Sequence, residues 1–169
     1  MYFIKSAILP DEKLIFATRP HWIVFAPAVM YLILAAFIYI AGAKYGITSE
    51  KILFNYSLQQ FFSGIVGAFG TYWLIRNAIF FFTSEYGITD KRVLMKTGWI
   101  ARNTLEIFLD KVEAINVDQS ILGRILGYGT LIIVGTGGTQ DPYFHVPAPL
   151  YFRRIAQEQV DTEVHKHRG

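Results

Sequence analysis

The stretch Trp22–Ala43, WIVFAPAVMYLILAAFIYIAGA, decides the architecture of this chain because none of its 22 residues carries a charged side chain. At about 1.5 Å of rise per residue, a helix of this length covers the roughly 30 Å hydrocarbon core of a bilayer. A second apolar stretch, Phe61–Phe82, is interrupted only by Arg76 and Asn77. The sequence that follows is polar enough for an ordinary folded domain. The two stretches therefore predict a transmembrane hairpin that carries one soluble domain.

The length of 169 residues leaves room for one small domain beside this apolar hairpin. We expect an N-terminal segment at residues 1–21, the hairpin at 22–82 with spans at about 22–43 and 57–76, and the folded domain at 84–169. The first span begins too far from the N-terminus, and is too long, for a cleavable signal peptide. It is therefore interpreted as a retained anchor.

Charge and composition exclude several classes of protein. The net charge is only +3, and from Arg76 onward 11 basic residues face 10 acidic ones. This near balance argues against a nucleic-acid binder, which would show a basic face or stripe. The chain contains no cysteine, which rules out disulfides, zinc–thiolate sites, iron–sulfur clusters and thiol catalysis.

Basic residues near the ends of the spans set the expected orientation, because cytoplasmic flanks carry an excess of Lys and Arg. Those on the two outer flanks outnumber those in the connecting loop, which holds Lys44 and Lys51. We expect both termini in the cytoplasm and the Lys44–Tyr56 loop outside. Arg76 then falls at the cytoplasmic interface, where its side chain can reach the headgroups. The outer-flank residues are Lys5, Lys13, Arg19, Arg76, Lys91, Arg92, Lys96 and Arg102.

The part after the hairpin shows strand patterns first and a helix pattern last. Alternating or β-rich segments predict strands at 86–89, 92–97, 103–109, 112–118, 130–134 and 143–146. In the segment 112–118 the buried face stays open, because Ile115 and Val117 share a face with Glu113. Ser120 and Gly127 bracket a helical turn or two. Residues 148–166 predict a helix with Phe152, Ala156, Val160 and Val164 on one face. Together they predict an α+β unit in which a curved antiparallel sheet is plugged or covered by the last helix.

Two runs within this part carry a family resemblance. Residues 86–93, YGITDKRV, resemble the EYxVTNxRV opening of the bacterial pleckstrin-homology (PH)-like family of membrane proteins. Residues 112–130, VEAINVDQSILGRILGYGT, are similar to that family's VExIxVxQSxLGRLLGYGT core. The turn at 135–138 and the start of the last helix at 149–152 fit as well. The resemblance covers about Glu85 to Gln157, and several spaced elements occur in the same order.

The resemblance implies a PH-like antiparallel β-roll or barrel closed by a C-terminal helix, in a multi-pass protein of a prokaryotic plasma (inner) membrane. It implies no catalytic activity. About five or six strands can be recognised, fewer than a complete PH barrel contains, so a strand is supplied by a neighbour or is unrecognised in this chain. The residues that carry the family motif, and that we expect to have structural roles, are Thr89, Arg92, Gly123, Arg124, Gly127, Gly129, Gly137 and Gly138.

No motif points to catalysis, a metal or a cofactor. Gly135–Gly138 is rich in glycine, but no Lys follows it, so a hairpin turn is favoured over a phosphate-binding loop. The GxSxG motif of serine hydrolases is missing. His165 and His167 lie in a polar tail beside other charged residues, which favours a solvated terminus. We therefore expect a protein that is not an enzyme and that holds no cofactor.

The basic residues around the first predicted strands suggest contact with lipid headgroups. Eukaryotic PH folds often bind phosphoinositides through basic residues on the hairpin of strands 1 and 2, and each Lys or Arg near an anionic surface adds about 1 kcal/mol. The alternative is that these residues only complete the positive-inside bias and solvate one edge of the sheet. The candidates for headgroup binding are Arg76, Lys91, Arg92, Lys96 and Arg102.

Two functions follow. The first is a non-enzymatic, membrane-anchored PH-like module that binds a protein partner at the cytoplasmic membrane face, in the assembly or regulation of a membrane complex. An open edge strand, or the groove beside the last helix, would accept a segment of that partner. The alternative is a lipid-headgroup-contacting or self-assembling protein that organises the membrane, as a homo-oligomer formed through its spans.

Overall fold

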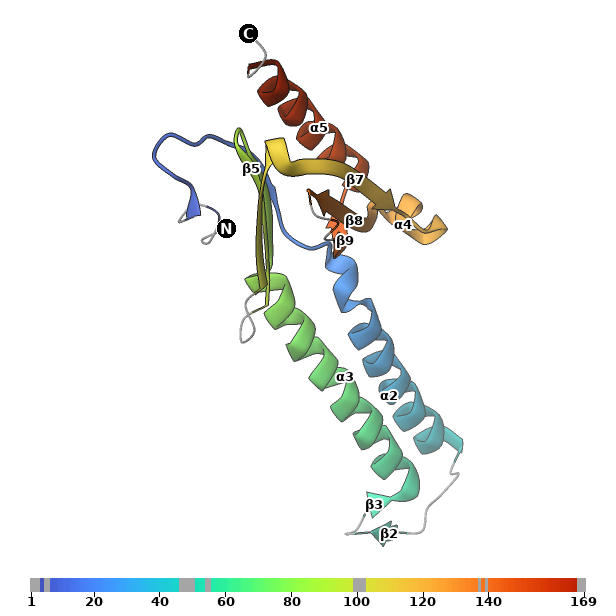
Figure 1. Cartoon of the computed structure of the whole chain (residues 1–169). Coiled ribbons are helices and arrows are strands. Elements are labelled where there is room, and N and C mark those ends of the chain that lie inside the picture. The colour runs from blue at the N-terminus through green and yellow to red at the C-terminus, as the bar shows by residue number, and fades with distance from the viewer. Residues whose placement is uncertain are drawn as a thin grey trace. The chain divides into compact units, whose positions relative to one another are not determined.

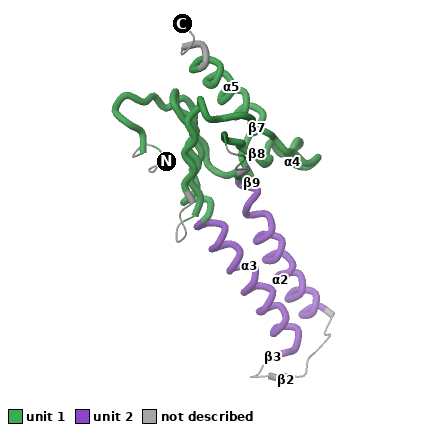
Figure 2. The backbone as a smooth tube through the Cα atoms, viewed as in Figure 1, with its two compact units in different colours: residues 1–21, 80–169 green, residues 22–79 purple. Residues whose placement is uncertain are grey.

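The computed structural model describes residues 4, 7–45, 51–53, 56–98, 103–136, 138 and 140–166. Lys5, Arg102, Gly137 and His167, four residues of the expectations above, lie outside them. The chain forms two compact units (Figure 2): residues 22–79 make one, and residues 1–21 together with 80–169 make the other. Each unit is described by itself.

The unit 22–79 is a pair of long helices (Figure 1). A 3₁₀ turn, η1 (Trp22–Phe25), leads into α2 (Ala26–Tyr45), and the short strands β2 (Lys51–Leu53) and β3 (Tyr56–Ser57) lead into α3 (Leu58–Thr83). The prediction of two helices is confirmed. α3 continues through Arg76 and Asn77 and runs further than the expected span of 57–76.

Polar side chains join the two helices to each other. Ser63 Oγ donates a hydrogen bond to the carbonyl of Ala35 (2.9 Å), and Asn77 Nδ2 donates to the carbonyl of Val24 (2.7 Å). Asn77 is buried although it interrupts the apolar stretch. Its amide therefore serves helix pairing, which explains why a polar residue stands inside the helix.

The other unit is an α+β domain with two antiparallel sheets. The first sheet has the strand order β1-β4-β5-β6, and the second has the order β7-β8-β9. A 3₁₀ turn, η2 (Leu109–Lys111), and the short helix α4 (Ile121–Leu126) lie in the connections, and α5 (Pro149–Lys166) ends the domain. The strands are β1 (Leu14–Thr18), β4 (Glu85–Thr89), β5 (Arg92–Thr97), β6 (Asn103–Phe108), β7 (Val112–Asp118), β8 (Tyr128–Gly135) and β9 (Gln140–Pro147).

β1 is the strand that the sequence did not reveal. The sequence predicts a separate segment at residues 1–21, whereas the described part of it, residues 4 and 7–21, belongs to the domain. β1 pairs antiparallel with β4, and Ala17 lies opposite Gly87 and Thr18 opposite Tyr86. The helices α2 and α3 are therefore an insertion between two neighbouring strands of one sheet. The domain has seven strands among the residues described, and the strand missing from the sequence pattern comes from the same chain.

Both sheets and α5 share one hydrophobic core. Side chains from β4, β5, β7, β8 and β9 meet in it, and Phe152 and Ala156 of α5 are fully buried against them. Val160 packs at its margin, which confirms the predicted stripe on the last helix; the side chain of Val164 lies outside the described part.

A bulge in β7 resolves the open question of its buried face. The register with β8 shifts between Val112 and Ala114, so Glu113 is exposed while Val112, Ile115 and Val117 all pack against the core. An extra residue in one strand reverses the side-chain alternation beyond it. The alternation of β7 alone could not show this.

Candidate functional site

The motif residues Thr89 and Arg92 lie on the outer face of the first sheet, under an N-terminal strap formed by residues 4 and 7–12. Ile4 is buried against β4, close enough that a Cβ added to Gly87 would lie 2.8 Å from Ile4 Cδ1. The backbone N–H of Ile4 donates to Glu85 Oε2 at 3.0 Å. This cover explains why every residue of β4 is buried, including Glu85 and Thr89.

Arg92 on β5 ties this strap to the sheet. Its Nε and Nη2 donate to the two carboxylate oxygens of Glu12, each at 2.9 Å, and Nη2 also donates to the carbonyl of Ala7 at 2.9 Å. Nη1 pairs with Glu106 on β6. Thr89 Oγ1 donates to Glu12 at 2.6 Å and accepts from the backbone N–H of Arg92 at 3.0 Å. The motif residues Thr89 and Arg92 thus form one buried polar network.

The network determines the charge states of its members. Burial alone would raise the pKa of Glu12, but hydrogen bonds from Arg92, Thr89 and the backbone of Leu9 outweigh it and lower that pKa to about 2. The hydrogen bond to Glu12 also raises the pKa of Arg92. Both groups are therefore charged at neutral pH and form a bidentate ion pair, in which paired hydrogen bonds satisfy the buried charges.

Within the domain, the described headgroup candidates Lys91, Arg92 and Lys96 do not gather at one place, and Arg102 lies outside the described residues. Arg92 is committed to Glu12 and Glu106, and its side chain is 10% exposed. Lys91 lies in the turn between β4 and β5, and Lys96 lies half-buried toward the far end of β5. Arg76 lies on α3, with its guanidinium carbon 4.8 Å from the centre of the Trp73 ring. Because β1 precedes them, β4 and β5 are the second and third strands of the domain, not the first and second as expected.

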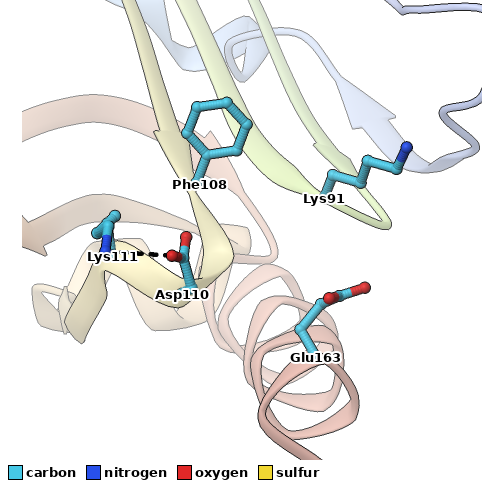
Figure 3. Close-up of a pocket in the computed structure, with 5 residues that line it drawn as sticks. All are labelled: Lys91, Phe108, Asp110, Lys111 and Glu163. Atoms are coloured by element: carbon cyan, nitrogen blue, oxygen red, sulfur yellow. Dashed lines mark ion pairs between the residues drawn. The ribbon is translucent and has the colours of Figure 1, made fainter. Parts of the chain in front are cut away.

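A cavity of about 300 Å³ lies beside α5, and Lys91 is one of its lining residues (Figure 3). The others are Phe108 of β6, Asp110 and Lys111 of η2, and Glu163 of α5. Lys111 Nζ lies 3.2 Å from Asp110 Oδ2, and both side chains are half exposed or more. Phe108 is exposed, although it ends a strand whose inward residues are buried. Two cationic, two anionic and one exposed aromatic side chain therefore line this cavity.

Three glycines of the family motif, Gly123, Gly127 and Gly129, shape the connection around α4. Ser120 Oγ accepts a hydrogen bond from the N–H of Gly123 at 3.1 Å, as a helix N-cap does. Gly127 ends the helix with φ +77°, and Gly138 has φ +76°, a conformation that glycine adopts without strain. A Cβ on Gly123 would lie 2.6 Å from the carbonyl oxygen of Tyr128, and one on Gly129 would lie 2.8 Å from that of Asp118. Arg124, by contrast, is exposed on α4.

Two histidines flank Tyr128 at the end of the domain where β1 leads into the first apolar helix. The rings of His21 and Tyr128 stack with their centroids 5.5 Å apart, and His145 lies 6.1 Å from Tyr128 on a tilted plane. The N–H of His21 donates to the carbonyl of His145 at 2.6 Å. His145 has φ +58°, which is rare for a residue other than glycine. No local sequence pattern predicts this cluster, because its members are far apart along the chain.

Comparisons with known proteins identify the fold family. A family model described as "Bacterial PH domain" matches residues 54–160, which is more than half of the chain. The match includes α3, all strands from β4 to β9 and most of α5, and it leaves out β1. No curated protein and no solved structure was found to match the chain. Among the described residues, no group of three or more His, Asp or Glu could hold a metal ion.

Proposed function

Since the chain belongs to the bacterial PH domain family, we propose that it is a non-enzymatic, membrane-anchored module that binds a protein partner at the cytoplasmic face of a prokaryotic plasma membrane. The family membership supports a binding role, because a PH-like fold supplies a scaffold and no reaction of its own. The helices α2 and α3 support the anchor, and the cavity beside α5 supports the partner site.

The helices α2 and α3 support the membrane anchor. Both are long and apolar enough to cross a membrane. Many of their large apolar side chains are exposed: Phe37 is 68% exposed, Ile33 64% and Tyr72 62%. Exposed apolar area on this scale marks a surface that something apolar covers, and lipid tails suit two helices of this length.

The pairing of β1 with β4 supports the orientation. These strands are hydrogen-bonded neighbours, yet β1 lies before the helices and β4 after them. This pairing supports two crossings, since an even number of crossings keeps both ends of the insertion on one side of the membrane. The excess of Lys and Arg on the outer flanks supports the cytoplasm as that side.

The mixed charge of the cavity beside α5 is the observation that carries the partner proposal. Lys91 and Lys111 are balanced by Asp110 and Glu163, so the lining residues have no net charge. An anionic headgroup would meet two carboxylates there. A protein segment with an apolar side chain for Phe108 and charges of both signs beside it matches the lining better.

Photo-crosslinking in native membranes tests this proposal. A photoreactive phenylalanine analogue replaces Phe108 in the full chain, and the captured species is identified by mass spectrometry. The matched control carries the same analogue at Phe144, which is similarly exposed on β9. We expect a discrete protein adduct from position 108 only, and we expect Lys91→Glu to reduce it several-fold.

Three outcomes would contradict partner binding at this cavity. These are adducts with lipid, adducts only with other copies of this chain, and equal capture from positions 108 and 144. The first two would support the alternatives of headgroup contact and self-assembly.

A further inference from the structure

α4 presents large aliphatic side chains that the domain does not bury. Ile121 is 80% exposed, Ile125 74% and Leu122 63%. The helix projects from the connection between β7 and β8 (Figure 1). Burying such side chains stabilises a protein, so three of them exposed on a helix of six residues indicate a surface that something else covers.

The backbone of α4 is held rigidly, so this exposure is built into the fold. Ser120 caps its first turn, and Gly127 caps its last. Gln119 Nε2 donates to the carbonyls of Gly123 and Tyr128, each at 3.0 Å, and so closes the base of the connection. Gln119 and Ser120 thus bond the backbone of the connection, while Ile121, Leu122 and Ile125 are exposed.

The contacts of Tyr128 show that the end of α4 lies close to His21, the last residue before the first apolar helix. Tyr128 follows directly after the cap of α4, and its ring stacks on His21. His21 also donates its N–H to His145, and the residue after it, Trp22, begins the first apolar helix. α4 therefore lies at the end of the domain from which the chain enters its apolar hairpin.

We propose that α4 is an interfacial anchor that inserts Ile121, Leu122 and Ile125 among the lipids of the leaflet from which α2 starts. Arg124, exposed on the same short helix, is placed to meet headgroup phosphates. With six residues, α4 is too short to cross a bilayer, so its aliphatic side chains would enter only the interfacial region. This inference rests on the proposed function, because it requires α2 and α3 to hold the domain at a membrane.

Depth-dependent fluorescence quenching tests the proposal on the full chain. The chain has no native cysteine, so single cysteines can be labelled cleanly with an environment-sensitive dye. Leu122→Cys and Ile125→Cys report on α4, Glu158→Cys on the exposed face of α5, and Phe37→Cys on α2. The protein is reconstituted into vesicles of phosphatidylcholine and phosphatidylglycerol that contain lipids with shallow or deep quenchers.

We expect shallow-quencher lipids to quench the labels at 122 and 125 several-fold more than the label at 158. Deep-quencher lipids should quench the label at 37. Quenching at 37 without quenching at 122 and 125 would overturn the interfacial anchor while leaving the membrane hairpin intact. No quenching at any position would overturn both. A blue-shifted signal at 122 that grows with the protein-to-lipid ratio, without lipid quenching, would assign α4 to contact with a second copy and overturn the proposal.

Discussion

Arg92 and Glu12 form a bidentate ion pair, with both nitrogen–oxygen distances at 2.9 Å, between residues separated by 80 positions. The apolar helices α2 and α3 lie entirely within that separation. The pair therefore closes the domain across its own insertion. It also commits the family-motif arginine to a structural role on the outer face of the sheet.

Removing Glu12 should loosen the strap. Glu12→Ala leaves Arg92 with Glu106 as its one remaining acidic partner in the described part of the chain, and breaking one partner of a buried pair costs about 3–5 kcal/mol. We expect faster hydrogen–deuterium exchange in β1 and at the C-terminal end of β4, where Thr89 bonds Glu12, measured by mass spectrometry on the full chain in detergent. The control is Arg154→Ala, which removes an exposed i,i+4 pair with Glu158 and should change stability by less than about 0.5 kcal/mol. Equal exchange in both variants would contradict the role of the pair.

The same pair predicts an acid transition. The pKa of Glu12 is lowered to about 2, against about 4.3 for an unperturbed glutamate. A lowered carboxyl pKa gives stability that is fully present above the unfolded-state pKa and is lost as the pH falls towards 2. The melting temperature of the wild type should therefore fall more steeply between pH 4.5 and pH 2 than that of Glu12→Gln. Parallel pH profiles would show that Glu12 is not paired.

The histidine cluster predicts a second transition at higher pH. Burial lowers the pKa of His145, with a further contribution from His21, and burial lowers the pKa of His21 as well. Stability from a lowered histidine pKa is present above about pH 6.5 and is lost as the pH falls below that value. His145→Asn should flatten the melting-temperature profile between pH 7 and pH 5, since asparagine tolerates the positive φ at this position. An unchanged slope of the melting temperature against pH would show that His145 does not cause this transition.

Two glycines of α4 should differ in their sensitivity to alanine. At Gly123 the new Cβ would lie 2.6 Å from a backbone oxygen, which cannot move without distorting the start of β8. At Gly127 nothing lies within 4 Å, and only the positive φ opposes the change, at about 1 kcal/mol. Gly123→Ala should therefore lower the melting temperature more than Gly127→Ala. The reverse order would contradict the packing described around Tyr128.

Local features of the fold could be predicted from the sequence because their signals lie within a few residues. Gly98 marked the end of β5, and the alternation of β7 gave its bounds. Ser120 and Gly127 gave the ends of α4, and the spacing of Phe152 and Ala156 gave the buried face of α5. Each of these depends on contacts with the next turn or the next strand.

The features that were missed depend on pairing between distant parts of the chain. The run Leu14–Thr18 is apolar and β-rich, but it is short and adjoins a much longer apolar stretch, so only its partner β4 identifies it as a strand. Arg92 was grouped with the headgroup candidates because its sequence neighbours are basic. Its acceptor Glu12 precedes the apolar hairpin in the sequence and Arg92 follows it, so no local pattern could connect the two.

The central claim is that the first strand and the rest of the domain lie on one side of a membrane, joined by a hairpin that crosses it twice. Single cysteines at the exposed positions Pro10, Asp118 and Lys44 test this by labelling with a membrane-impermeant maleimide, in intact cells and after permeabilisation. We expect the cysteines at positions 10 and 118 to be labelled only after permeabilisation, and the cysteine at position 44 to be labelled in intact cells. Different labelling at positions 10 and 118, or identical labelling at all three, would contradict it.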